Sequence, residues 1–308
     1  MSQAEPAERP VEDGRGMAQG NWCYQDAFAR HRGLISIEEQ ERLRCSKVAI
    51  VGMGGVGGIH LITLTRLGVG GFHIADPDGF ELANFNRQYG ANVRNLGRNK
   101  AEAMADEARA INPDLQLRVF AEAITPANVG PLLDGVDVFL DGIDFFAIEA
   151  RRLVFREARR RGVWAITAGP IGFSAAWLVF SPEGMSFDEY FDVSDAMDRG
   201  DQLVAFLAGL TPRATHLSYL DLSRVDVKSG RGPSAGLACH LCSGVAAAET
   251  IKILMGRSPI RPAPWYFQFD AYRQRLCSGR LRWGNRSPGQ RLKRRLLRRR
   301  LERLGWRL

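Results

Sequence analysis

The first feature that could do chemistry is a glycine-rich turn, Gly52-Met53-Gly54-Gly55-Val56-Gly57, between a strand-like run and a helical pattern. Glycines let backbone N–H groups approach a phosphate closely, and the N-terminus of the following helix adds partial positive charge. Asp76 ends the next strand-like run, where a carboxylate can accept hydrogen bonds from ribose hydroxyls. The pattern therefore predicts a nucleotide site, with Gly52, Gly54, Gly55 and Gly57 facing the phosphates.

The polar residues after Asp76 bear on which nucleotide binds. The pyrophosphate of a nicotinamide or flavin dinucleotide is held by backbone amides and needs no cluster of cations. A triphosphate carries more charge and extends beyond the loop. A guanidinium group that donates two N–H bonds, such as that of Arg87, and an ammonium group, such as that of Lys100, would neutralise it. Asp144, after a later strand-like run, could bind Mg²⁺ that bridges those phosphates. The sequence therefore favours ATP with Mg²⁺, and the same stretch contributes Asp78, Asn84 and Gln88.

Short apolar runs alternate with amphipathic stretches between residues 47 and 171, which predicts a Rossmann-like, doubly wound parallel sheet of the α/β class. After Gly172 the next run follows too soon for a crossover helix, so we expect antiparallel strands in the C-terminal half. Ligands bind outside the carboxyl ends of such strands, where the residues above would gather. The predicted strands are 47–51, 72–76, 115–120, 136–141, 163–168, 175–180 and one within 264–272, and the predicted helices are 36–45, 59–67, 100–111, 147–161 and 234–255.

Composition divides the chain into three parts. Residues 1–20 are rich in Pro, Gly and acids without periodicity, which predicts a disordered extension. Residues 21–279 form one α/β domain, in which 183–233 is an acidic insert. Residues 280–308 hold twelve Arg and Lys and one Glu, so this tail carries 12 − 1 = +11 and the rest of the +8 chain carries 8 − 11 = −3.

Leucines at near-helical spacing make the tail a predicted amphipathic helix. Such a helix could bind RNA phosphates, lie on an anionic membrane, dock against the acidic insert, or remain a solvated terminus. The sequence leaves these four options open.

The overall composition, 45% apolar and 25% charged, is typical of folded globular proteins. No run approaches the roughly 18 uninterrupted apolar residues of a membrane span, and the start is too polar for a secretory signal. We therefore expect a cytoplasmic protein without a membrane span. Its five scattered cysteines do not suggest a disulfide framework.

Taken in order, the motifs resemble the ThiF/MoeB/E1 superfamily of ATP-dependent enzymes that adenylate carboxylates. The resemblance covers about residues 30–275, and the motif region is most similar to the tRNA threonylcarbamoyladenosine dehydratase branch. It implies a homodimer in which Arg30 reaches the partner's ATP. It also implies Asp76 on the ribose, Asn84, Arg87 and Lys100 on the phosphates, and Asp144 on Mg²⁺.

The chain departs from the superfamily in three places. Many members pass the acyl group to a cysteine in the crossover segment, but 183–233 contains none, which favours direct transfer from the adenylate. One Cys-x-x-Cys pair, Cys239 and Cys242, lies on one face of a helical pattern, which suits core packing better than zinc binding because zinc needs four ligands. A redox pair or a late acyl-accepting thiol is the other interpretation. Phe145 stands where many members carry Asn, so either a polar contact is missing or Phe145 packs beneath the site.

Three hypotheses about function result. The first is ATP-dependent adenylation of a carboxylate on a small molecule, a peptide or a protein C-terminus, with Arg87, Lys100, Asp144 and Arg30 as the catalytic residues. The second is a tRNA-modifying cyclase or dehydratase that binds tRNA through the basic tail. The third is an NAD- or FAD-binding oxidoreductase or a non-catalytic nucleotide-binding protein.

Overall fold

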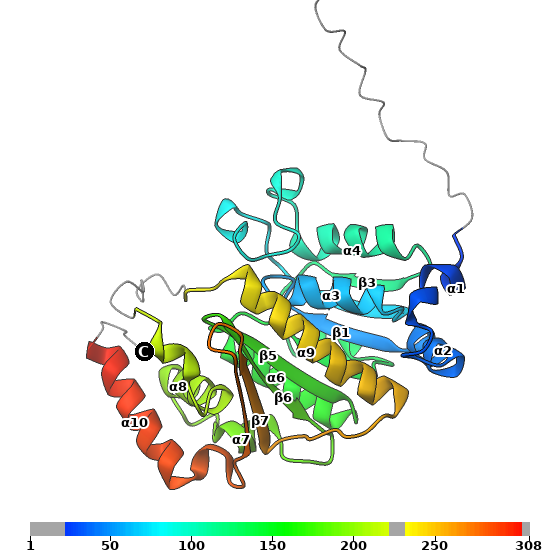
Figure 1. Cartoon of the computed structure of the whole chain (residues 1–308). Coiled ribbons are helices and arrows are strands. Elements are labelled where there is room, and N and C mark those ends of the chain that lie inside the picture. Colours follow the sequence, from blue (N-terminus) through cyan, green and yellow to red (C-terminus); the bar gives the residue numbers. More distant parts are fainter. Residues whose placement is uncertain (1–21, 222–231, 304–308) are drawn as a thin grey trace, which may run out of the picture.

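The computed structural model describes residues 22–221 and 232–303, which fold around one eight-stranded sheet (Figure 1). The predicted extension, 1–20, lies outside the described residues. The strand order is β3-β2-β1-β4-β5-β6-β7-β8. The strands are β1 Lys47–Val51, β2 Gly71–Ala75, β3 Gln116–Phe120, β4 Val138–Asp141, β5 Trp164–Ile171, β6 Ser174–Phe180, β7 Trp265–Asp270 and β8 Arg275–Arg280.

The sheet changes character at β5. All neighbours from β3 to β5 are parallel, whereas β5–β6, β6–β7 and β7–β8 are antiparallel. Only Gly172 and Phe173 separate β5 from β6, too few residues for a crossover helix. The predicted fold is thereby confirmed. Because β1 lies between β2 and β4, the strand order reverses there, and open α/β sheets bind ligands beyond the carboxyl ends of such strands.

Helices cover both faces of the sheet. On one face α3, α4 and α9 bury side chains such as Leu61, Met104 and Cys239. On the other, α6, α7 and α8 bury Phe155, Phe187 and Phe206. The α-helices are α1 Tyr24–Ala27, α2 Ile37–Cys45, α3 Gly57–Arg66, α4 Lys100–Ile111, α5 Val129–Leu132, α6 Ile148–Arg160, α7 Phe187–Phe191, α8 Arg199–Leu210, α9 Gly236–Met255 and α10 Pro288–Arg303. The 3₁₀ helices are η1 Ala29–His31, η2 Leu82–Asn84, η3 Val93–Asn95, η4 Thr215–Ser218 and η6 Gly284–Arg286.

The acidic insert contains helices that the sequence did not indicate. Its described part forms α7 and α8, each started by a side-chain cap. Ser186 and Glu189 make a reciprocal capping box, and Asp198 accepts the N–H of Asp201. The acids of this segment therefore serve partly as helix starts rather than only as a charged surface.

Helix α9 is the apolar centre of one helical layer. Its 20 residues make it long and apolar enough to cross a membrane, but it packs against β5, β6 and α3 (Figure 1). Cys239 and Cys242 are both fully buried in this layer. No group of three or more His, Cys, Asp or Glu that could hold a metal occurs among the residues that the structure describes.

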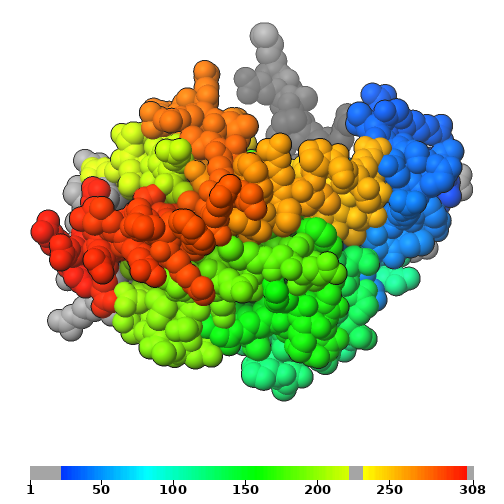
Figure 2. Space-filling model, turned by 90° about the horizontal axis from the view of Figure 1, so that it is seen from below, coloured from blue at the N-terminus to red at the C-terminus, as the bar shows by residue number. Residues whose placement is uncertain are grey.

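Pro288–Arg303 of the basic tail forms α10, which lies on α8 at the surface of the molecule (Figure 2). Arg294 donates to the Asp192 carboxylate at 2.9 Å, and Arg298 pairs with Asp201 and Asp198. Leu301 is buried beneath the helix. Of the options that the sequence left open, these contacts support docking against the insert.

Candidate nucleotide-binding site

The glycine turn follows β1 at the carboxyl edge of the sheet and depends on the absence of side chains. Gly52 has φ +86°, and a Cβ there would lie 2.1 Å from the Gly142 carbonyl oxygen. A Cβ on Gly57 would lie 1.6 Å from the Gly52 carbonyl oxygen. Real Cβ atoms do not approach so closely, so Gly52 and Gly57 are required for this backbone path, which brings the turn against the loop after β4.

Asp76 connects the turn to the segment after β2. Its Oδ2 accepts the Met53 N–H at 2.6 Å, and its Oδ1 accepts the Asp78 N–H at 2.8 Å. Burial raises the pKa of the Asp76 carboxyl, while these two N–H donors and the charge of Lys100 oppose the rise. Each oxygen keeps acceptor capacity beyond these bonds, as ribose hydroxyls would need.

Lys100 opens α4 and lies beside the same segment. Its Nζ lies 3.1 Å from the Asp78 carboxylate, and only 8% of its side chain is exposed. The backbone N–H of Lys100 also donates to the Asp78 carbonyl, at 2.8 Å. The ammonium group is thus fixed near Asp76, where it can add positive charge to the site.

Arg87 and Gln88 lie against the other side of the glycine turn. Arg87 Cγ lies 3.9 Å from the position that a Cβ on Gly55 would take. Gln88 Nε2 lies 3.5 Å from the position that a Cβ on Gly54 would take. The Arg87 guanidinium donates to the Ala83 carbonyl at 2.9 Å, and Gln88 Oε1 is buried without a hydrogen-bond partner in the described residues. Both side chains therefore border the space in front of the turn.

Asp144 lies in the loop after β4 (residues 142–147, the Asp144 loop), two residues beyond Gly142, whose carbonyl oxygen lies against Gly52. It is exposed, and its Oδ1 accepts the Phe146 N–H at 2.9 Å. Arg151 of α6 anchors this loop from beneath: its Nε donates to Asp141 at 2.8 Å, and its two Nη atoms donate to the carbonyls of Ile143 and Phe145. The loop is therefore held at three points by one buried guanidinium.

The arrangement combines a glycine turn, a buried carboxylate at the second strand, two cations and an exposed carboxylate at one edge of the sheet. The sequence profile of the ThiF family matches residues 28–292. The chain belongs to the ThiF family.

Two curated proteins and one crystal structure illustrate the relationship. The chain is 35% identical over 238 residues to the probable adenylyltransferase/sulfurtransferase MoeZ of Mycobacterium tuberculosis, covering 74% of this chain and 53% of MoeZ. It is 33% identical over 126 residues to the tRNA threonylcarbamoyladenosine dehydratase of Escherichia coli, covering 41% of this chain and 46% of that protein. The chain thus spans about half the length of these relatives. The crystal structure of PaaA has the same fold, with a TM-score of 0.64, 20% identity and 87% of each chain covered.

The structure brings most of the predicted site residues of this ThiF-family chain together, but two differ from the rest. Asn84 is buried, and its side-chain carbonyl caps η2 by accepting the Glu81 N–H at 2.9 Å. Arg30 is exposed in η1, which follows α1. Tyr24 of α1 donates to the Gly68 carbonyl, which lies just beyond the C-terminal end of α3. Arg30 therefore lies at the amino edge of the sheet, away from the glycine turn of its own chain.

Cys239, which is buried, and Phe145, which is half-buried, also border the site. Cys239 Sγ would lie 3.0 Å from a Cβ on Gly55. The predicted core packing of Cys239 did not include this contact with the glycine turn. Burial raises the pKa of the Cys239 thiol, although the charge of Arg87 opposes this, so the thiol is a weak nucleophile at neutral pH. Phe145 is half-buried with its ring 5.8 Å from that of Phe206, which fits packing beneath the site.

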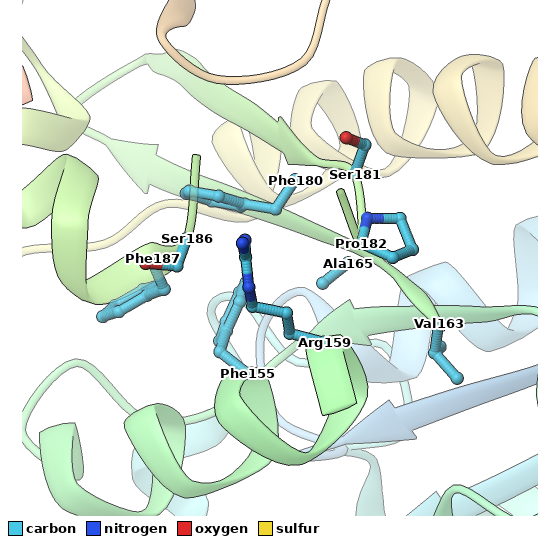
Figure 3. Close-up of a pocket in the computed structure, with 9 residues that line it drawn as sticks. All are labelled: Phe155, Arg159, Val163, Ala165, Phe180, Ser181, Pro182, Ser186 and Phe187. Atoms are coloured by element: carbon cyan, nitrogen blue, oxygen red, sulfur yellow. The ribbon is translucent and has the colours of Figure 1, made fainter. Parts of the chain in front are cut away.

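A small pocket elsewhere is not part of this site. It lies between α6 and the segment after β6, under the Arg159 side chain, and its volume is about 10 Å³ (Figure 3). Val163 precedes β5 and Phe180 ends β6, so the pocket is at the amino edge of the sheet. It is too small for a nucleotide, and none of the nucleotide-site residues described above lines it.

Arg151 supports the loop after β4, and the sequence did not predict this role. It stands in an arginine-rich helix, and nothing in the spacing between Asp141 and Arg151 distinguishes this arginine from its neighbours. Only the packing of α6 under the end of β4 shows which arginine enters the loop.

Proposed function

We propose that this chain uses ATP to adenylate a carboxylate at the carboxyl edge of its sheet. The observation that carries the proposal is the convergence of Asp76, Arg87, Lys100 and the Asp144 loop on one glycine turn. Membership of the ThiF family and the similarity to a probable adenylyltransferase support it.

The proposed reaction needs positioning and charge neutralisation more than acid–base catalysis. A carboxylate oxygen of the substrate attacks the α-phosphorus of ATP, and the bond from this phosphorus to the oxygen that bridges to the β-phosphorus breaks. Pyrophosphate leaves with the bonding electrons, and an acyl-adenylate remains. The N–H groups of the turn bind phosphate oxygens, Asp76 orients the ribose, and Arg87 and Lys100 neutralise charge that grows on the leaving group.

The residues present fit a magnesium ion. Mg²⁺ prefers oxygen ligands and is usually bound through one or two carboxylates plus substrate phosphates. Asp144 is exposed in the loop that contacts the turn, and its Oδ2 makes no hydrogen bond to the described residues, so this oxygen would hold the ion. Bound there, Mg²⁺ would neutralise phosphate charge.

We further propose that the acyl group passes directly from the adenylate to its acceptor. The segment 183–233 has no cysteine, and Cys239 is a buried thiol with a raised pKa. The substrate would be a small molecule, a peptide or a protein C-terminus, and the enzyme a homodimer that brings Arg30 to the partner's ATP.

Carboxylate-dependent exchange of labelled pyrophosphate into ATP tests the proposal, because an oxidoreductase cannot catalyse it. Arg87→Ala, Lys100→Ala and Asp144→Ala should each lower the exchange rate by at least ~100-fold with an unchanged circular dichroism spectrum. Near-normal exchange in any of them would contradict its assignment to the phosphates. Tight binding of NAD with none of ATP, measured by calorimetry, would refute the proposal as a whole.

A second candidate is a tRNA-modifying cyclase or dehydratase, favoured by the 33% identity to the E. coli tRNA threonylcarbamoyladenosine dehydratase. In that case the carboxylate would belong to a modified nucleoside. ATP consumption that depends on tRNA carrying this nucleoside, and on no peptide, would distinguish it.

A further inference from the structure

The arginines of α10 divide into two sets with different surroundings. The set that faces the protein is matched by acids: Arg294 pairs with Asp192, and Arg298 pairs with Asp198 and Asp201. The outer set has no such partners. Its side chains are exposed and make no hydrogen bond or ion pair to the part of the chain that the structure describes: Arg291, Arg295, Arg299, Arg300 and Arg303.

The outer set forms a regular row. Arg291, Arg295, Arg299 and Arg303 are four residues apart, so they lie on one side of the helix with a rise of about 6 Å between neighbours. Leu292 and Leu296, 57% and 56% exposed, run beside this row. Like charges this close repel one another, so an anionic partner would relieve the repulsion of the whole row.

We infer that this row, which we term the outer arginine row (Arg291, Arg295, Arg299 and Arg303), is a binding surface for RNA. Planar guanidinium groups match phosphates with paired N–H donors, and the row contains arginine at all four positions. The inference concerns a surface outside the proposed adenylation site and requires no adenylation.

An anionic membrane is the competing partner, and the packing of α10 argues against it. A helix that lies in a membrane inserts its apolar face among the lipid chains. In α10 part of that face is already used, because Leu301 is buried against the protein and Leu297 is half-buried. Only Leu292 and Leu296 are left on the outside, so the exposed surface is predominantly cationic.

The position of the row adds a further argument. Arg298 contacts Asp198 and Asp201 at the start of α8, and Arg199 in that same turn donates to the Phe146 carbonyl at 2.9 Å. The row therefore extends toward the end of α8 that borders the Asp144 loop. RNA bound along α10 would run toward the nucleotide edge of the sheet.

The test measures how tightly the full chain binds a fluorescein-labelled 24-nucleotide RNA hairpin with a single-stranded 3′ end. Fluorescence anisotropy gives the Kd at KCl concentrations between 50 and 300 mM. The variant Arg291→Glu/Arg295→Glu/Arg299→Glu should weaken binding at least ~10-fold, and the slope of log Kd against log salt should fall by roughly 2 to 3. The neutral variant with Gln at the same positions should show a smaller loss in the same direction. Pyrophosphate exchange should be unchanged in both, because none of these residues belongs to the nucleotide site.

The matched control is Arg32→Glu/Arg66→Glu/Arg94→Glu, which changes the net charge equally at exposed arginines elsewhere. It should alter RNA affinity less than ~2-fold. Absence of RNA binding at 50 mM KCl, or equal losses in the control, would overturn the inference. So would vesicles of phosphatidylserine and phosphatidylcholine that bind through the outer arginine row while RNA binding does not depend on it.

Discussion

Arg151 provides the sharpest test of how the fold supports the nucleotide edge. Its side chain is 4% exposed and that of Asp141 is 1% exposed, with 2.8 Å between Arg151 Nε and Asp141 Oδ2. The guanidinium also contacts two carbonyls of the Asp144 loop and lies 4.5 Å from the centre of the Phe206 ring. Arg151→Met keeps most of the side-chain volume but removes the charge and all of these donors.

The expected cost follows from burial. Removing one partner leaves the other charge in the interior without compensation, which typically destabilises by about 3–5 kcal/mol. The Asp141 carboxylate would keep only the Ile143 N–H, at 3.1 Å, among its described side-chain hydrogen bonds. Asp141→Asn/Arg151→Met leaves neither charge of this pair, so the double variant should recover about 1–3 kcal/mol relative to Arg151→Met alone.

Urea unfolding at pH 7 measures these free energies, and pyrophosphate exchange measures the effect on the loop. The control is Arg160→Met on the same helix, because Arg160 lies 2.6 Å from Glu157 but is 67% exposed. That surface pair should contribute less than about 1 kcal/mol. If Arg151→Met costs no more than Arg160→Met, or if the double variant is as unstable as the single one, the pair does not anchor the loop.

Two further predictions concern the turn and the core. Gly52→Ala should reduce the ATP affinity measured by calorimetry at least ~10-fold, because the new Cβ would meet the Gly142 carbonyl. The control is Gly97→Ala: Gly97 also has a positive φ, +80°, but a Cβ there would have no atom within 4 Å, so ATP affinity should be unchanged. Equal affinities in the two variants would refute the close approach. His60 is fully buried, and burial lowers its pKa from 6.5 to about 3, so between these values the unfolded chain binds a proton that the folded chain does not. The free energy of unfolding should therefore fall as the pH drops from 6.5 toward 4, and His60→Leu should lessen this slope by roughly 1 kcal/mol per pH unit; an unchanged slope would mean that His60 is charged in the native state.

Local patterns were sufficient to predict the parallel core. Apolar runs bounded by glycine or proline correspond to β1–β7, and the Ser36-x-x-Glu39 pattern at the start of α2 is a capping box in the structure. These features are encoded within a few residues of one another. The glycine turn belongs to the same group, because strand, glycines and helix are contiguous.

Features that depend on tertiary partners were not predictable. Strand β8 reads Arg-Leu-Cys-Ser-Gly-Arg without apolar alternation, and it forms because it pairs along the whole of β7. Helices α7 and α8 lie in a segment that its many acidic residues make look like an exposed insert, although both helices bury aromatic side chains. The ion pair of Asp141 with Arg151 depends on how α6 packs under β4, which one sequence alone does not specify.

Helix α8 has a consequence for anyone who shortens or rebuilds this protein. Its N-terminal end carries α10 through Asp198 and Asp201, and Arg199 there donates to the Phe146 carbonyl in the Asp144 loop. Further along α8, the Phe206 ring packs against that of Phe145 in the same loop. Truncation before Pro288 would strip the arginines from those aspartates and leave like charges crowded at the first turn of α8. Loosening of α8 would be transmitted to the nucleotide edge of the sheet. Reduced activity of a shortened protein could therefore result from a destabilised fold as well as from the loss of a binding partner.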